Sequence, residues 1–101
     1  MSTPLFPRDQ FFVIAGPCVV EGDRLNLRVA DQLARLAERV PGGIIFKASF
    51  DKANRSNAGA HRGPGLAAGL EALARVRDRT GLRILTDVHE AGQCAVVAEV
   101  V

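Results

Sequence analysis

Three cationic side chains gather in one short stretch of the chain. Residues 46–56 read Phe-Lys-Ala-Ser-Phe-Asp-Lys-Ala-Asn-Arg-Ser, which places Lys47, Lys52 and Arg55 close together with hydroxyl and amide side chains between them. Ammonium and guanidinium groups flanked by such donors suit phosphate or carboxylate groups. The stretch therefore predicts an anion-binding loop, and a solvated basic loop is the alternative.

Three short runs rich in apolar residues are each followed by polar residues. The runs are residues 11–15, 43–48 and 82–88, and Gly and Pro residues bound the first two. The first run is continuously apolar, as is typical of a strand buried on both faces of a parallel sheet, and the apolar residues 43–46 of the second indicate a buried strand. We therefore expect three strands, with polar residues at the end of each.

The segments between the strands have helical periodicity. A helix is expected from Gly22 or Asp23 to residues 41–42, with a second helix ending at a left-handed cap near Gly81 and a third over residues 90–101. The first helix repeats its apolar residues at spacings of four, four, three and four, at Leu25, Val29, Leu33, Leu36 and Val40. The corresponding faces of the other two are Leu66, Leu70, Leu73 and Val76, and then Cys94, Val97, Ala98 and Val101.

The order strand, helix, strand, helix, strand, helix predicts the α/β class, with parallel strands joined by right-handed crossovers. Polar residues would then meet at one edge of the sheet. They are Cys18 and Glu21 after the first strand, residues 47–56 after the second, and Asp87, His89 and Glu90 after the third. This pattern is typical of an active face, although Cys18 could be a packed small side chain, Asp87 could cap the third helix and His89 could pack on it.

Composition excludes several classes of protein. The chain has 101 residues, of which 48% are hydrophobic, and a net charge of +2 with no Trp or Tyr. This small charge and the lack of stacking residues argue against a nucleic-acid partner. The chain has no signal-peptide pattern and no apolar stretch long enough to span a membrane. Two cysteines without a pairing motif indicate a reduced, cytoplasmic protein.

The length bears on the domain organisation. The last expected helix is apolar and has no closing strand after it, whereas a complete (β/α)₈ barrel needs roughly 250 residues. We therefore expect residues 1–101 to be the N-terminal, incomplete portion of a single barrel domain. A small three-stranded α/β sandwich is the alternative.

Four motifs resemble successive signatures of one enzyme family. They are Ile14-Ala15-Gly16-Pro17-Cys18, the stretch of residues 46–56, Arg62-Gly63-Pro64-Gly65-Leu66 and Thr86-Asp87-Val88-His89-Glu90. In order and spacing they resemble the 3-deoxy-D-manno-octulosonate 8-phosphate synthases from Phe11 onward. The related heptulosonate synthases have a Lys-Pro-Arg-Thr type loop where this chain has residues 52–56, so the octulosonate enzymes are favoured.

The resemblance implies a TIM (β/α)₈ barrel, of which this chain would cover about the first three βα units. It implies a cytoplasmic, homotetrameric transferase of Kdo and lipopolysaccharide biosynthesis. Such an enzyme condenses phosphoenolpyruvate with D-arabinose 5-phosphate and releases phosphate. Two rivals stay open: a heptulosonate or sialic-acid type synthase that takes another aldehyde, and a non-catalytic anion-binding module.

The resemblance also assigns roles to residues of the active face. Lys47 and Lys52 would face phosphoenolpyruvate, with Lys52 also catalytic. Asp87, the second catalytic residue, would lie near the hydroxyl and aldehyde end of the sugar or order the nearby water and metal site. The group that would hold arabinose 5-phosphate is Asn54, Arg55 and Ser56. Ser49 and His89 complete the predicted substrate-binding set.

Cys18 places the chain beside the metal-dependent class of these synthases, since the metal-independent class has Asn at this position. The resemblance therefore implies that Cys18 is a ligand of a divalent metal, and a thiolate suits Fe²⁺, Zn²⁺ or Mn²⁺. The other ligands of the family come from strand ends beyond Val101. We therefore expect the 101-residue piece alone to be inactive.

Overall fold

The computed structural model describes residues 6, 8–51 and 63–101, and it contains one sheet of three parallel strands. The strands are β1 (Val13–Ala15), β2 (Ile44–Lys47) and β3 (Arg83–Leu85), in the order β1-β2-β3. The predicted α/β class and parallel pairing are confirmed. The predicted runs 11–15, 43–48 and 82–88 were too wide, because apolar residues at their ends, such as Phe11, Phe12 and Leu82, lie outside the ladder, as do the polar Thr86 and Asp87.

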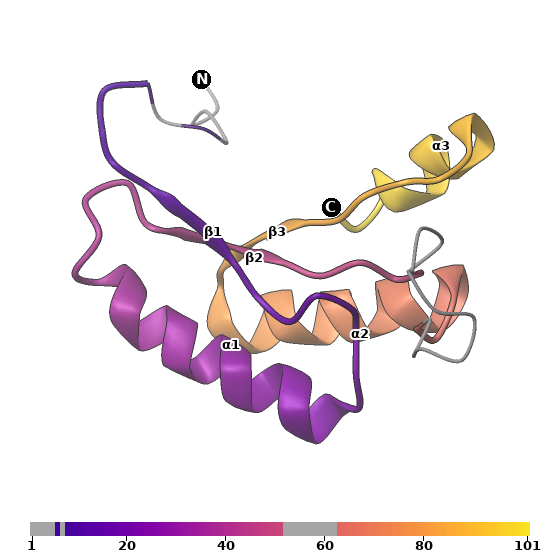
Figure 1. The fold of residues 1–101 in the computed structure, drawn as a ribbon, viewed down its shortest axis with the longest axis horizontal. Helices are drawn as coiled ribbons and strands as arrows, with labels where there is room; N and C mark the ends of the chain where they lie inside the picture. The colour runs from indigo at the N-terminus through magenta and orange to yellow at the C-terminus, as the bar shows by residue number, and fades with distance from the viewer. Residues whose placement is uncertain (1–5, 7, 52–62) are drawn as a thin grey trace.

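Helices α1 (Asp23–Ala37) and α2 (Leu66–Thr80) lie together on one face of the sheet (Figure 1). The predicted end of α2 is confirmed: Gly81 has φ 72° and its N–H donates to the Arg77 carbonyl at 2.8 Å. This backbone conformation favours glycine, because a side chain would be strained there. The helix α1 ends at Ala37, earlier than the predicted residues 41–42.

The core lies between the sheet and the two helices. Phe46 of β2 and Ile84 of β3 are partners in the ladder and both belong to this core. The predicted face of α2 is confirmed, since Leu70, Leu73 and Val76 are buried there. The opposite face of the sheet is not covered by these helices, so Ile14 of β1 is 46% exposed. The prediction that the first strand is buried on both faces was therefore wrong.

The buried face of α1 differs from the predicted leucine stripe. Leu25 and Leu36 are 47% and 51% exposed, whereas Ala30 is fully buried and Ala34 and Ala37 pack against the core. Small side chains on this face allow the helix to lie close to the sheet. Leu25 and Leu36 are therefore displaced to the flank of the helix. Only the middle of the predicted stripe, Val29 and Leu33, contacts the core.

The third helical segment was predicted wrongly in its face. A 3₁₀ turn (Ala91–Gln93) comes first and the α-helix α3 covers only Cys94–Val97. Within it Val97 is buried, while Cys94 is exposed. Because a 3₁₀ turn has about three residues per turn and not 3.6, it rotates the faces of the residues that follow. The turn begins after Glu90, so Asp87 is not the helix cap.

Two ion pairs join the exposed sides of α1 and α2. Arg75 Nε lies 2.9 Å from an Asp23 carboxylate oxygen, and Arg79 donates to both carboxylate oxygens of Asp31, with Nε to Oδ1 at 3.0 Å and Nη2 to Oδ2 at 2.9 Å. The hydrogen bonds from Arg79 lower the pKa of Asp31, and the same contact raises the pKa of Arg79. In the described part of the chain, no helix has the length and apolar character needed to cross a membrane.

Candidate active site

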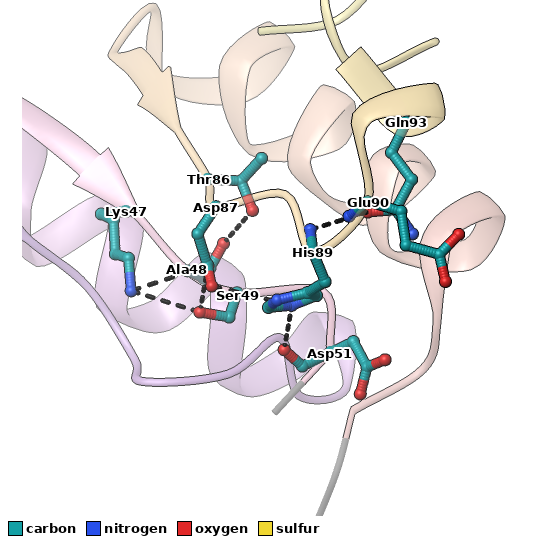
Figure 2. Close-up of polar contacts among 9 residues, drawn as sticks. All are labelled: Lys47, Ala48, Ser49, Asp51, Thr86, Asp87, His89, Glu90 and Gln93. Atoms are coloured by element: carbon teal, nitrogen blue, oxygen red, sulfur yellow. Dashed lines mark hydrogen bonds and ion pairs between the residues drawn. The ribbon is translucent and has the colours of Figure 1, made fainter. Parts of the chain in front are cut away.

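Side chains from β2 and from the segment after β3 meet at the carboxyl ends of the strands (Figure 2). The Ser49 hydroxyl donates to Asp87 Oδ1 at 2.5 Å and accepts from Lys47 Nζ at 3.2 Å. Lys47 Nζ and Asp87 Oδ1 are 3.9 Å apart. We call Lys47, Ser49, Asp87 and His89 the strand-end cluster. The predicted gathering of Lys47 and Asp87 at one sheet edge is confirmed.

Burial differs sharply within the strand-end cluster. Ser49 is 2% exposed, whereas the side chains of Lys47 and Asp87 are 35% and 47% exposed. A buried hydroxyl thus fixes a cation and a carboxylate that solvent can reach. A cation and an acceptor held side by side can bind an anionic group and orient a hydroxyl group of one ligand.

The segments after β2 and β3 keep the register of the sheet beyond the last strand residues. In the ladder Lys47 pairs with Leu85, a separation of 38 positions. Three side-chain contacts beyond the ladder have the same separation: Thr86 Oγ1 to the Ala48 carbonyl at 2.8 Å, Ser49 to Asp87, and His89 Nε2 to the Asp51 carbonyl at 2.7 Å. Side chains therefore continue the strand pairing into the candidate site.

His89 is held on several sides. Since the Asp51 carbonyl can only accept, its contact assigns the proton to Nε2 of the ring. The ring packs edge-on against Phe50, with centroids 5.5 Å apart, and the backbone N–H of His89 donates to Gln93 Oε1 at 2.9 Å. Nε2 also lies 3.7 Å from Asp87 Oδ2. The ring contacts thus lie on the segment after β2 and not on the third helix, where the alternative placed them, and the predicted substrate contact of His89 stays a prediction.

Cys18 lies where the pairing of the first segment with the second shifts by one residue. Ala15 is the partner of Phe46, and Val19 forms an isolated parallel bridge with Ser49. Four residue steps from Ala15 to Val19 in the first segment therefore correspond to three steps from Phe46 to Ser49 in the second. The first segment has one extra residue there, which forms a β-bulge. Such bulges redirect side chains and are frequent beside active sites. The thiol of Cys18 is exposed there.

Backbone hydrogen bonds hold this bulge against the strand-end cluster. The N–H of Ser49 donates to the Cys18 carbonyl at 3.2 Å, and the N–H of Val20 donates to the Ser49 carbonyl at 2.8 Å. Gly16 lies so close to β2 that an added Cβ would overlap the Lys47 carbonyl oxygen. The first loop is therefore fixed to the backbone of Ser49, whose side chain contacts both Lys47 and Asp87.

The donor chemistry of Cys18 fits a single position in a metal site. An exposed thiol can ionise and bind a soft or borderline cation. Across residues 8–51 and 63–101, no three His, Cys, Asp or Glu side chains come together in a way that could hold a metal ion. Cys18 could thus supply one ligand, and a metal would need others.

Several predicted site residues cannot be placed. Lys52, Asn54, Arg55 and Ser56 lie outside the residues that the structure describes, as does Arg62. Their assigned roles stay predictions.

Two residues of this region were missed from the sequence. Gln93 accepts from the backbone of His89 and forms a capping box with Glu90, a pairing that the spacing of three residues could have revealed. Asn26 is a buried residue of α1 whose amide contacts the backbone of Glu21. No periodic signal marks it, because a lone Asn within a helix has no characteristic partner.

Comparison with known proteins decides the family. The family model described as the DAHP synthetase I family matches residues 7–101. The chain belongs to the DAHP synthetase I family. Within it, similar curated proteins bear the name 2-dehydro-3-deoxyphosphooctonate aldolase, another name for the octulosonate 8-phosphate synthases, so the resemblance found in the sequence is confirmed.

The similarity to these family members extends over most of the chain. The Magnetococcus marinus protein is 54% identical over 88% of this chain and 31% of its own length. The Verminephrobacter eiseniae protein is 51% identical over 91% of this chain and 32% of its own length, and the Campylobacter jejuni protein is 48% identical over 90% and 34%. The chain therefore spans about a third of the length of the curated relatives that it matches.

Proposed function

We propose that this chain forms part of a transferase that condenses phosphoenolpyruvate with D-arabinose 5-phosphate to give 3-deoxy-D-manno-octulosonate 8-phosphate and phosphate. The observation that carries the proposal is the meeting of Lys47, Ser49 and Asp87 at the carboxyl ends of parallel strands. The names of the relatives, which describe an aldolase of 2-dehydro-3-deoxyphosphooctonate, support the same reaction.

The reaction has a charge requirement that the described residues help to meet. C3 of phosphoenolpyruvate attacks the aldehyde of the sugar, water adds at C2, and phosphate leaves with cleavage of the C–O bond. Both substrates are anionic, so fixed cations must offset their repulsion. Lys47, partly exposed and tethered by Ser49, would bind an anionic group of phosphoenolpyruvate.

Asp87 suits the other substrate. Its Oδ1 accepts from Ser49, but almost half of the side chain is exposed, so the carboxylate can also accept from a sugar hydroxyl near the aldehyde. Lys52 would take part in proton transfer or charge stabilisation. The group that would hold arabinose 5-phosphate is Asn54, Arg55 and Ser56, with the forked donor of Arg55 on its phosphate.

The proposal includes a metal and a larger assembly. Cys18 would supply a thiolate to a divalent Fe, Zn or Mn ion, which would order and polarise groups at the reacting carbons when bound. The three parallel βα units would be the first part of a TIM barrel, within a cytoplasmic homotetramer. Parallel strands with two helices on one face are consistent with this arrangement.

The test measures phosphate release from phosphoenolpyruvate and arabinose 5-phosphate. It compares the 101-residue chain with a protein of the relatives' length that carries it, for example with the remaining length supplied by the Magnetococcus marinus relative. We expect activity only in the longer protein, lost on chelation and restored by Mn²⁺. A well-folded longer protein with no activity would refute the assigned reaction.

Substrate choice needs a separate test, because the family model is named for DAHP synthetases. Erythrose 4-phosphate should replace arabinose 5-phosphate poorly in the longer protein. An Arg55→Ala variant should raise the KM for arabinose 5-phosphate much more than the KM for phosphoenolpyruvate. Preference for erythrose 4-phosphate would identify a heptulosonate type synthase.

A further inference from the structure

Asn26 is a buried polar residue on the inner side of α1. It is only 2% exposed, next to Ala30 one turn further along the helix, which is fully buried. Burying an amide is unfavourable unless its donor and acceptor groups are both satisfied. An aliphatic side chain would meet the packing need at this position without that requirement, so the amide calls for a specific explanation.

The explanation lies in a reciprocal pair of hydrogen bonds. Asn26 Oδ1 accepts from the backbone N–H of Glu21 at 2.9 Å, and Nδ2 donates to the backbone carbonyl of the same residue at 2.8 Å. One amide thus binds both polar groups of one peptide residue. The contact fixes the position of Glu21 in two directions, whereas a single hydrogen bond would allow rotation about it.

Glu21 belongs to the loop that carries Cys18. On the side of β2, this loop is held by the backbone bonds between Ser49 and the carbonyl of Cys18, and between Val20 and Ser49. On the side of α1, the helix cap Gly22 has no side chain to bind the loop. The amide of Asn26 therefore supplies a side-chain link from α1 to the loop, opposite the link to β2.

We propose that Asn26 is a positioning residue for Cys18: its amide fixes the loop that presents the thiol at the strand-end cluster. The inference rests on the proposed role of Cys18 as a metal ligand. Asn26 would not bind the metal itself but would orient the ligand Cys18. Replacing a residue that orients a metal ligand typically changes metal affinity by about 10–100-fold. No direct contact between Asn26 and a substrate is involved.

The test uses two replacements of Asn26 in the longer protein. Asn26→Leu keeps a similar volume and removes both hydrogen bonds. Asn26→Asp keeps the shape and the acceptor, but its ionised form places a second oxygen against the Glu21 carbonyl. When protonated, the carboxyl again offers one acceptor and one donor, as the amide does. The control is Val76→Ala, which opens a cavity in the core at α2 and leaves the residues of the loop and their hydrogen bonds with Asn26 and Ser49 unchanged.

The first measurement is amide hydrogen exchange at Glu21, relative to the wild type at each pH. Asn26→Leu should speed exchange at every pH. In Asn26→Asp, burial and the facing carbonyl raise the pKa of the new carboxyl, so exchange should be fast at neutral pH and return toward the wild-type rate as the pH falls. A side chain needed only for packing would give no such pH-dependent recovery.

The second measurement is Co²⁺ binding at neutral pH, followed by the absorption of the thiolate–cobalt bond. Asn26→Leu should bind Co²⁺ about tenfold more weakly, by analogy with other residues behind metal ligands, while Val76→Ala should bind as the wild type does. Unchanged exchange at Glu21, or equal Co²⁺ affinity in Asn26→Leu and the wild type, would overturn the proposal.

The two proposals fail in different ways. A wild-type protein that binds no Co²⁺ through Cys18 would reject both the metal role and the inference that Asn26 positions a metal ligand. A wild type that binds Co²⁺ normally, together with an unaffected Asn26→Leu variant, would reject only the role of Asn26.

Discussion

The buried hydroxyl of Ser49 offers a direct test of the strand-end cluster. Replacing Ser49 with Ala removes the donor to Asp87 and the acceptor for Lys47 with almost no change in volume. A hydrogen bond to a charged group contributes about 1.5–3 kcal/mol when both partners are desolvated. Since the Asp87 side chain is 47% exposed, water can replace much of the lost contact, so we expect a coupling energy of about 1 kcal/mol.

A double-mutant cycle isolates this energy. Four forms of the longer protein are compared: the wild type, Ser49→Ala, Asp87→Ala and the double variant. The free energy of unfolding is measured for each in denaturant. The cost of Ser49→Ala should be about 1 kcal/mol greater when Asp87 is present than when it is Ala. The cycle removes the separate contacts of Asp87 with Lys47 and His89 from the result.

A coupling energy within about 0.3 kcal/mol of zero would refute the reasoning, because it would mean that the two side chains are independent in solution. The same variants test function. In the Ser49→Ala variant, Lys47 loses its hydrogen bond with residue 49 and should bind phosphoenolpyruvate less well. The KM for phosphoenolpyruvate should therefore rise. If the KM for phosphoenolpyruvate in Ser49→Ala equals that of the wild type, Lys47 does not need the hydrogen bond with Ser49 to bind this substrate.

Two further predictions concern the first loop and the outer helices. Gly16→Ala should destabilise the protein by about 1–3 kcal/mol in denaturant unfolding, since the new Cβ would overlap the Lys47 carbonyl; Gly22→Ala is the control, with open space at its Cβ and no comparable loss. Asp31→Asn should destabilise the protein at neutral pH, and the difference from the wild type should disappear as the pH falls through the lowered pKa of Asp31, where the carboxylate paired with Arg79 is protonated. A difference that persists unchanged in strong acid would contradict the ion-pair explanation.

The α/β order and the end of α2 could be predicted because local signals and packing agree there. The periodicity of Leu70, Leu73 and Val76 matches the buried face, and Gly81 has the left-handed conformation that its position indicated. In α1 the two disagree. Leu25 has a strong hydrophobic signal yet is exposed, because the face that contacts the sheet is decided by how closely the helix can approach it.

The candidate site was predictable only in outline. Parallel strands require Lys47 and Asp87 to leave the sheet at the same edge, so their proximity follows from the topology. The buried hydroxyl between them depends on side-chain directions beyond the strands, which the pattern of the chain does not specify. The link between Asn26 and Glu21 is a contact between a side chain and the backbone, and no residue type in the sequence marks its backbone partner.

The contacts that extend the register of β2 and β3 have unequal consequences for sequence change. Thr86 and His89 contribute side chains, whereas Ala48 and Asp51 contribute only main-chain carbonyl oxygens. These bonds depend on the backbone path at the two acceptor positions, and at Ala48, which is fully buried in the core, a larger side chain would disturb that path. At these two contacts the segment after β3 supplies the side chains and the segment after β2 supplies main-chain acceptors, whereas at the third contact Ser49 and Asp87 both contribute side chains. Sequence change in related chains should accordingly be limited at residues 86 and 89 by these hydrogen bonds, and at residue 48 by packing.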